Sequence, residues 1–250
     1  MNLIILTDSD KLDQTRYLLG DHRAEHIKTV LKLEVGDSFE IGLLNGPRGA
    51  AVIEKISQDI TVKIEQLAEI PPPEPTVDLV CALPRPQTLK KVLFTSAMMG
   101  VRTLHLIRAN RVEKSYFQSP LLESENYTPH LIEGLSQGKL TRLPGVVVHD
   151  RFKVFFEDTL PGLEKNLNIV PVKLAADPEA KADLGETLDK NAGWLIFAVG
   201  PEGGWVPFEI ETMEKAGFRG FTLGRWLLRV EHAVTATLSQ LELLHREPGG

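Results

Sequence analysis

Cysteine is almost absent from this sequence of 250 residues, which contains only Cys81. A single cysteine excludes an intrachain disulfide and argues against a cysteine-based metal site, so we expect no metal. No stretch reaches the 18 or so apolar residues of a membrane helix. The opening MNLIILTDSD has too short an apolar run and too many acids for a signal peptide. We therefore expect a soluble, cytoplasmic protein without a membrane partner.

Positive charge is scarce overall, since the formal net charge is -6, but it is unevenly distributed. Residues 1–70 hold 8 Lys+Arg and 12 Asp+Glu, a net charge of -4, whereas residues 83–153 hold 11 against 5, a net charge of +6. Residues 154–250 hold 9 against 15, again a net -6. The basic middle third is either a solvated surface or the part of the chain that contacts an anionic partner.

The segment IPPPEPTVD, Ile70 to Asp78, predicts a boundary between two domains, residues 1–70 and 76–250. Four prolines in five positions cannot join a central strand or a helix interior, and they form a stiff spacer. Before this segment we expect a helix at 24–33 and strands at 39–44, 49–56 and 59–67. The turn signal NGPR separates the first two of these strands. This pattern favours a small β-barrel with one helix.

Strands and helices alternate after the spacer. The apolar patterns predict strands at 76–83, 101–109, 144–150, 168–174, 193–200 and 218–224, and helices at 86–100, 125–137, 151–163, 207–217 and 230–247. Such alternation is typical of an α/β domain with a mainly parallel sheet.

The stretch WLIFAVGPEGGW, residues 194–205, leaves a strand through three glycines, a proline and a carboxylate. A strand that enters a glycine loop and then a helix often forms a binding site, because the backbone N–H groups stay accessible. The spacing fits neither a P-loop nor a dinucleotide fingerprint, and a turn kept for its conformation is an equal reading.

A second loop, FTLGRWLLRVEHA at 221–233, leaves the next strand through Gly224. Two such loops should lie side by side at the carboxyl edge of one sheet, where α/β ligand sites form. Its arginines, Arg225 and Arg229, either contact a ligand or pair with Glu202, Glu231 or surface acids.

These motifs resemble the SPOUT superfamily of RNA methyltransferases, and more narrowly the 16S ribosomal RNA uracil-N3 methyltransferases, often called RsmE. VGPEGGW is similar to the family's I-G-P-E-G-G-F, and LGRWLLRVEHA to its L-G-x-R-I-L-R-x-E-T-A. EHIKTVLKLEVGD at 25–37 is similar to its amino-terminal motif, so the resemblance spans both domains. The chain departs from the pattern at Thr95, Met98, Ser136 and Trp226.

The resemblance implies a carboxyl-terminal SPOUT-type α/β domain with a trefoil knot and a small amino-terminal PUA-like, RNA-binding β-barrel. It implies S-adenosyl-L-methionine as cofactor and methylation of a uracil N3 in the 16S rRNA of the small ribosomal subunit. It also implies a homodimer, to which the last helix would contribute Val234, Leu238, Leu241 and Leu244 unless this apolar face packs on its own sheet.

Three groups of site residues follow from the resemblance. The catalytic candidates are Arg229 and Arg111, as cations near the uracil oxygens, and Glu202, with Glu231 and His232 as further possible proton acceptors. The cofactor-binding candidates are Leu174, Gly200, Gly203, Gly204, Leu223, Gly224, Leu227 and Leu228, although core packing also explains leucines. The RNA-binding candidates are His26, Lys28, Lys32, Arg85 and Arg142. The alternative function is a non-catalytic RNA-binding or ribosome-assembly factor that retains the fold.

Overall fold

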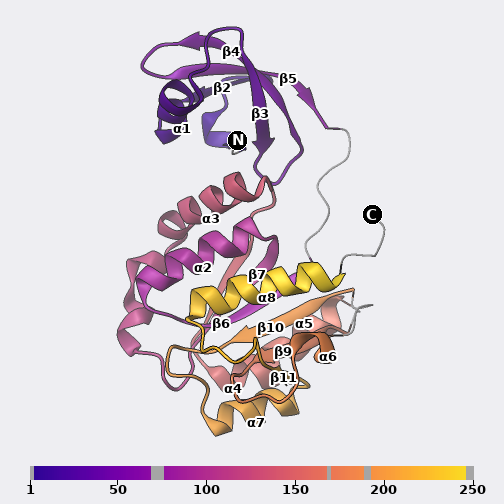
Figure 1. Ribbon diagram of the computed structural model, residues 1–250. Helices are drawn as coiled ribbons and strands as arrows, with labels where there is room; N and C mark the ends of the chain where they lie inside the picture. Colours follow the sequence, from indigo (N-terminus) through magenta and orange to yellow (C-terminus); the bar gives the residue numbers. More distant parts are fainter. Residues whose placement is uncertain (1–2, 69–75, 168–169, 189–192, 246–250) are drawn as a thin grey trace. The chain divides into compact units, whose positions relative to one another are not determined.

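The computed structural model of the chain describes residues 3–68, 76–167, 170–188 and 193–245 (Figure 1). It divides into two compact units, one of Met1–Glu74 with Ile132–Leu143 and one of Pro75–Leu131 with Pro144–Gly250. Most of the proline-rich boundary segment lies outside the described residues. The first unit contains residues 132–143, which the sequence analysis assigned to the second domain.

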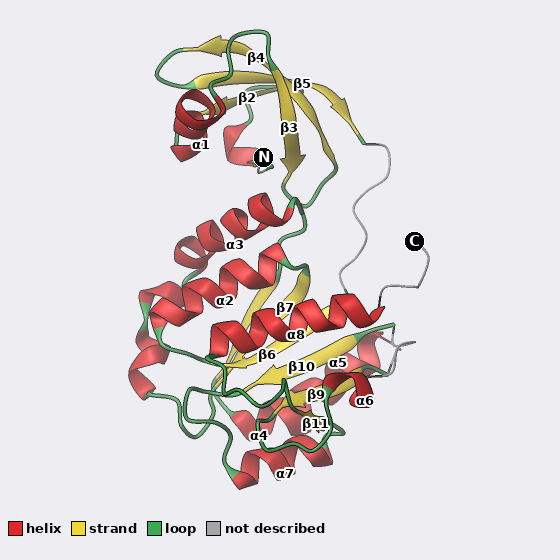
Figure 2. Ribbon diagram, viewed as in Figure 1, coloured by secondary structure: helices red, strands yellow, loops and turns green. Residues whose placement is uncertain are grey.

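The first unit is a curled sheet of five strands with a short helix (Figure 2). Its elements are β1 (Ile4–Leu6), β2 (Arg16–Leu19), α1 (His22–His26), β3 (Ser38–Leu43), β4 (Arg48–Ile56) and β5 (Ile60–Leu67), in the sheet order β1-β3-β4-β5-β2. The strands β3, β4 and β5 were predicted, and they form an antiparallel meander. Neither β1 nor β2 was predicted, because each is short and depends on a strand far along the chain, β3 and β5 respectively.

The segment 132–143 is fastened to the first unit by hydrogen bonds. The Ser136 hydroxyl donates to the Leu3 carbonyl, and the Thr141 hydroxyl donates to the Gly46 carbonyl at 2.6 Å. The Lys139 ammonium lies 2.5 Å from a Glu40 carboxylate oxygen. Ser136, a departure from the family pattern, therefore has a structural role here.

The second unit is a six-stranded parallel sheet with helices on both faces. Its strands are β6 (Val77–Ala82), β7 (Val101–Ile107), β8 (Gly145–His149), β9 (Val172–Ala176), β10 (Leu195–Val199) and β11 (Arg219–Phe221), in the order β11-β9-β10-β6-β7-β8. Its helices are α2 (Pro86–Met98), α3 (Ser124–Gly138), α4 (Phe152–Val154), α5 (Leu160–Leu167), α6 (Leu184–Thr187), α7 (Pro207–Lys215) and α8 (Val230–His245), and the boundary between the units falls inside α3. This architecture confirms the predicted α/β class.

The central strands β6 and β10 are buried along almost their whole length, as expected where helices cover both faces of a parallel sheet. The helices α2 and α8 pack against each other over one face (Figure 1). Phe152, Phe155 and Phe156, in and just after α4, pack on the other face with Trp205 and Met213. The trefoil knot stays a prediction.

The apolar face of α8 is used within its own unit. Val234, Leu238 and Leu241 are at most 4% exposed, and the helix contacts α2 and β10. This face could contact a second copy or pack on its own unit, and packing on its own unit accounts for these three side chains. No helix in the described part of the chain is long and apolar enough to cross a membrane.

Candidate active site

Three neighbouring strands, β9, β10 and β11, send loops from the same edge of the sheet, because they run parallel. The loops are joined by hydrogen bonds where they leave the strands. The indole Nε1 of Trp205, after β10, donates to the Ala176 carbonyl at the end of β9 at 3.2 Å. The backbone N–H of Asp177 donates to the Phe221 carbonyl at the end of β11 at 2.9 Å. The two predicted glycine loops and the loop after β9 thus form one edge.

The glycine loop after β10 needs its glycines for conformation. Gly204 has φ +73°, in the left-handed region that favours glycine, and its N–H donates to the Pro201 carbonyl at 2.8 Å. A Cβ on Gly200 would lie 3.1 Å from the Trp205 ring. The conformational reading of Gly204 is therefore correct, and it is compatible with a binding role because Gly203 is exposed and Gly204 is partly exposed.

Arg111 contacts the glycine loop from the loop that follows β7. Its guanidinium Nη1 donates to the Gly203 carbonyl. A Cβ on Gly203 would lie 2.9 Å from the Cδ of Arg111, so the glycine makes room for the arginine. The structure therefore brings together two residues that the sequence analysis assigned to different roles, a catalytic cation and a cofactor-binding glycine.

Sequence reasoning missed Glu209, a buried carboxylate that joins the same two loops. Its Oε1 accepts from the Asn110 backbone N–H at 2.6 Å, and its Oε2 accepts from the Val206 backbone N–H at 3.0 Å. The residue is 2% exposed. The available signal was weak, because an acid in the first turn of a helix, here the one after Pro207, is common and specifies no tertiary partner.

The loop after β11 is open to solvent. Gly224 has φ +111°, and Trp226, Leu227 and Leu228 are 71%, 82% and 39% exposed. The guanidinium of Arg225 lies 4.6 Å from the Trp226 ring centroid, a cation–π contact. The predicted cofactor residues Leu223, Leu227 and Leu228 are all at least partly exposed, so core packing does not explain them.

Arg229 ends this loop at the start of α8 and is exposed. Its side chain makes no ion pair with any residue of the described ranges, and neither does that of Glu202. The other predicted partner, Glu231, instead lies 3.1 Å from the Lys91 ammonium of α2. Arg229 therefore pairs with neither of these two acids, and its exposed guanidinium is open to a ligand.

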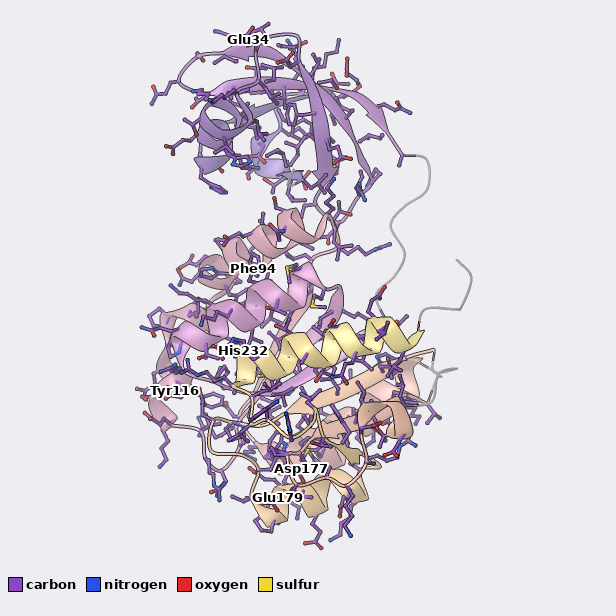
Figure 3. The ribbon with its side chains drawn as sticks, in the orientation of Figure 1. Glu34, Phe94, Tyr116, Asp177, Glu179 and His232 are labelled. Carbon is purple, nitrogen blue, oxygen red and sulfur yellow. The ribbon has the colours of Figure 1, made fainter. Side chains whose placement is uncertain are left out.

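The two other proton-acceptor candidates lie in the first turn of α8, where Figure 3 labels His232. Burial of Glu231 would raise its pKa, but its own backbone N–H and the Lys91 ammonium outweigh that effect and lower it. A carboxylate held in its charged form by such partners is a weak base. His232 is exposed, as a helix-surface histidine would be.

Glu202 is exposed on the glycine loop and lies within electrostatic range of β6 and of Tyr116. Burial raises the pKa of the Cys81 thiol, and the Glu202 carboxylate raises it further. Partial burial and the carboxylates of Glu113 and Glu202 raise the pKa of the Tyr116 hydroxyl, against the opposing charge of Arg85. Arg85, exposed at the N-cap of α2, therefore lies near enough to Tyr116 to act on the same hydroxyl as Glu202.

Leu174 is the cofactor candidate that lies deepest. It is fully buried in β9, two residues before the strand ends at Ala176, and pairs in register with Phe197. Its side chain is part of the sheet interior, in contrast to the exposed leucines of the loop after β11.

The remaining RNA-binding candidates lie in the first unit. His26 ends α1, and Lys32 follows a π-helical turn (Ile27–Leu31) in a left-handed conformation with φ 53°. The Lys28 ammonium donates to the carbonyls of Ser57 and Gln58, both at 2.7 Å, so this cation is already engaged. Arg142 lies in the 132–143 segment and is partly buried.

Known proteins show the same two-part organisation. Residues 72–242 match an RNA methyltransferase domain, and residues 19–67 match an RNA methyltransferase PUA domain. A protein of Treponema pallidum named ribosomal RNA small subunit methyltransferase E is 31% identical over 245 residues, covering 94% of this chain and 88% of the relative. A relative of Borreliella burgdorferi, named ribosomal RNA small subunit methyltransferase E 1, is 27% identical over 237 residues, covering 94% and 95%.

Solved structures share the fold. The ribosomal RNA small subunit methyltransferase E of Neisseria gonorrhoeae, bound to S-adenosyl methionine, has a TM-score of 0.74 at 18% identity and covers 97% of this chain and 98% of its own. A putative methyltransferase of Legionella pneumophila in complex with the same cofactor has a TM-score of 0.75 at 19% identity, with the same coverage. With its matched RNA methyltransferase and PUA domains and a relative 31% identical along nearly its whole length, the chain belongs to the ribosomal RNA small subunit methyltransferase E family.

Proposed function

We propose that this protein transfers a methyl group from S-adenosyl-L-methionine to the N3 atom of a uracil in 16S rRNA of the small ribosomal subunit. The observation that carries the proposal is the carboxyl edge of the second unit's sheet. There the glycine loop exposes backbone at Gly203, the loop after β11 exposes leucines, and the cations Arg111 and Arg229 lie on the surrounding loops. The relatives' names and the cofactor in the Neisseria structure support the same reaction.

The residues of this edge fit the cofactor. Gly203 is exposed and Gly200 and Gly204 are partly exposed, so their backbone groups would meet polar groups of the cofactor, and Leu227 and Leu228 would cover an apolar ring. Leu223 and Gly224 would shape the loop between these two groups, and buried Leu174 would support β9 from below. The cofactor supplies a methyl group on a sulfonium, and the protein's task is to orient the uracil toward it.

Uracil N3 carries a proton and becomes a good nucleophile only when that proton leaves. A cation beside the uracil oxygens favours the resulting anion, by the same logic as an oxyanion hole. Arg229 is the first candidate because its exposed guanidinium pairs with no acid among the described residues. Arg111 is the second, although one of its N–H groups is engaged by Gly203. Exposed Glu202 is the candidate proton acceptor.

We place the RNA on both units. His26, Lys32 and Arg142 would contribute from the first unit and Arg85 from the second, whereas Lys28 would first have to leave the two carbonyls that it binds. The first unit alone has a net negative charge, so phosphate binding needs the basic residues of 83–153 as well. With a ribosomal substrate, we expect the protein to act in the cytoplasm.

The proposed homodimer rests on the loop after β11. Trp226, Leu227 and Leu228 are 71%, 82% and 39% exposed on the single chain, so this loop presents a contiguous apolar surface that the cofactor and a second copy would cover together. Sedimentation at micromolar concentration should give about twice the 27.8 kDa chain mass. A monomer at all accessible concentrations would contradict the dimer.

The test of the reaction uses small subunits from cells that lack the protein. Incubation with the purified chain and S-adenosyl-L-methionine should produce 3-methyluridine in 16S rRNA, detected by mass mapping of nucleosides. The alternative, a non-catalytic RNA-binding or assembly factor, predicts binding of the subunits without methyl transfer. Absence of 3-methyluridine with intact subunit binding would therefore replace the proposed function with that alternative.

A further inference from the structure

Glu209 differs from the other buried carboxylates of the second unit. Asp78 and Glu231 each face a cation, Arg102 and Lys91 respectively. Among the described residues Glu209 faces no cation, and both of its oxygens accept backbone N–H groups. These N–H groups belong to Asn110, after β7, and Val206, after β10.

A second contact joins the same two loops. Arg111 directly follows Asn110, and its guanidinium donates to the Gly203 carbonyl of the glycine loop. The loop after β7 is thus held to the loop after β10 at two points. Glu209 fixes the backbone at Asn110, and Arg111 contacts the backbone at Gly203.

We propose that Glu209 is a positioning residue, which fixes the backbone beside Arg111 and so sets where the Arg111 guanidinium lies against the glycine loop. The inference rests on the proposed function, in which Arg111 favours the uracil anion. A charged acceptor is suited to this role because hydrogen bonds to an ionised group are shorter and stronger than neutral ones. Burial of the residue excludes water as a competing partner.

The variant that tests the link is Glu209→Gln. An amide of the same size has one accepting oxygen, so one of the two backbone N–H groups must face the NH2 group instead. Exposed Glu214, on the same helix, gives the matched control Glu214→Gln. Glu209→Asp, whose side chain is shorter by one CH2 group and draws the carboxylate back from the Asn110 N–H, replaces the first variant if Glu209→Gln does not fold.

The first measurement is hydrogen exchange in the free protein, which needs no activity. The Asn110 amide should exchange at least tenfold faster in Glu209→Gln than in the wild type and in Glu214→Gln. Faster exchange only in the first turn of α7, with Asn110 unchanged, would mean that Glu209 merely caps that helix, and would overturn the proposal.

The second measurement is the single-turnover rate of methyl transfer at saturating cofactor. Displacement of a positioned group by about 1 Å can cost on the order of 10² in rate, so we expect Glu209→Gln to be at least tenfold slower. In combination with Arg111→Ala, Glu209→Gln should cost little more, because it acts through Arg111. Additive losses would overturn the proposal, whereas an inactive wild type would contradict the proposed function and leave the exchange result standing.

Discussion

The two ends of the parallel sheet in the second unit are built in different ways. At the start of β6, buried Asp78 accepts from the Arg102 guanidinium and, at 3.1 Å, from the Trp194 indole, and Arg102 also lies 4.8 Å from the Trp194 ring centroid. At the carboxyl edge the loops are held by hydrogen bonds from Trp205, Arg111 and Glu209 to backbone groups, and Arg229 and Glu202 remain exposed. The Asp78–Arg102 pair thus serves stability at one end, whereas Arg229 and Glu202 at the other end stay exposed to a ligand.

We call the end with the Asp78–Arg102 pair the closed end of the sheet and the carboxyl edge its open end. The largest effect should come from the closed end. Arg102→Met leaves the Asp78 carboxylate, which is 0% exposed, without its cation. Loss of one partner of a buried pair typically costs about 3–5 kcal/mol of unfolding free energy. Urea unfolding followed by tryptophan fluorescence measures this directly, because Trp194, Trp205 and Trp226 all lie in the second unit.

The control for that measurement is Arg219→Met, at an exposed arginine of β11, which should cost little. Adding Asp78→Asn to Arg102→Met removes the buried charge, keeps an acceptor for Trp194 and should recover part of the loss. Equal stability of Arg102→Met and Arg219→Met would break the comparison at this end.

The matching variant at the open end is Arg229→Ala. We expect it to lower the rate of methyl transfer by about 10²–10³, the usual cost of losing one group that stabilises an oxyanion, with little change in unfolding free energy. Part of the rate should return as pH rises, because uracil N3 then loses its proton more readily. Single-turnover rates across pH on small subunits provide the measurement.

Arg229→Lys should restore only part of the activity, because one ammonium cannot replace a planar guanidinium. If Arg229 has a structural role instead, Arg229→Ala would lose stability and keep its rate. That result would mean that Arg229 stabilises the fold, as Arg102 does, and does not act in the reaction.

Acid should weaken the sheet through the histidines between β7 and β8. His105 Nδ1 lies 3.1 Å from His149 Nε2, and burial, with the nearby charges of His149 and Arg102, lowers the pKa of His105 to about 3. Below pH 6.5, the ordinary pKa of histidine, the His105 imidazole binds a proton in the unfolded chain. In the native protein it stays neutral down to about pH 3. Stability is therefore complete above pH 6.5 and falls as pH decreases, by roughly 1.4 kcal/mol per unit.

Urea unfolding at pH 7 and pH 5 tests this contribution. His105→Phe should reduce the difference between the two pH values by about 2 kcal/mol, whereas His22→Gln, at an exposed histidine of the first unit, should not change it. An unchanged pH dependence in His105→Phe would show that His105 does not cause the loss of stability in acid.

The smallest effect concerns the cofactor surface. In Gly203→Val, a branched side chain would meet Arg111, whose Cδ would lie 2.9 Å from the new Cβ. We expect the affinity for S-adenosyl-L-methionine to fall by at least tenfold, about 1.4 kcal/mol. Isothermal titration calorimetry measures it, with Gly162→Val as the control, because no heavy atom lies within 4 Å of a Cβ at Gly162. Unchanged affinity in a folded Gly203→Val would move the pocket elsewhere.

Much of the architecture followed from local patterns in the sequence. The buried run at 195–199, the alternation of strands and helices and the turn residues Gly204 and Gly224 are local signals, and the structure confirms the elements that they predicted. The order of the strands in the sheet, the strands β1 and β2 and the place of residues 132–143 were not predictable in this way. Each depends on pairing with residues far along the chain.

The sequence by itself determined the α/β class, the two glycine loops and the family motifs, because these depend on neighbouring residues and on the backbone conformations that glycine permits. Only the tertiary structure decided what each charged group faces. Asp78 meets Trp194 across 116 residues, and Glu209 meets Asn110 across 99. Whether a carboxylate stabilises the fold, positions a loop or remains open to a ligand depends on partners and burial that chain folding brings together, and no local pattern specifies them.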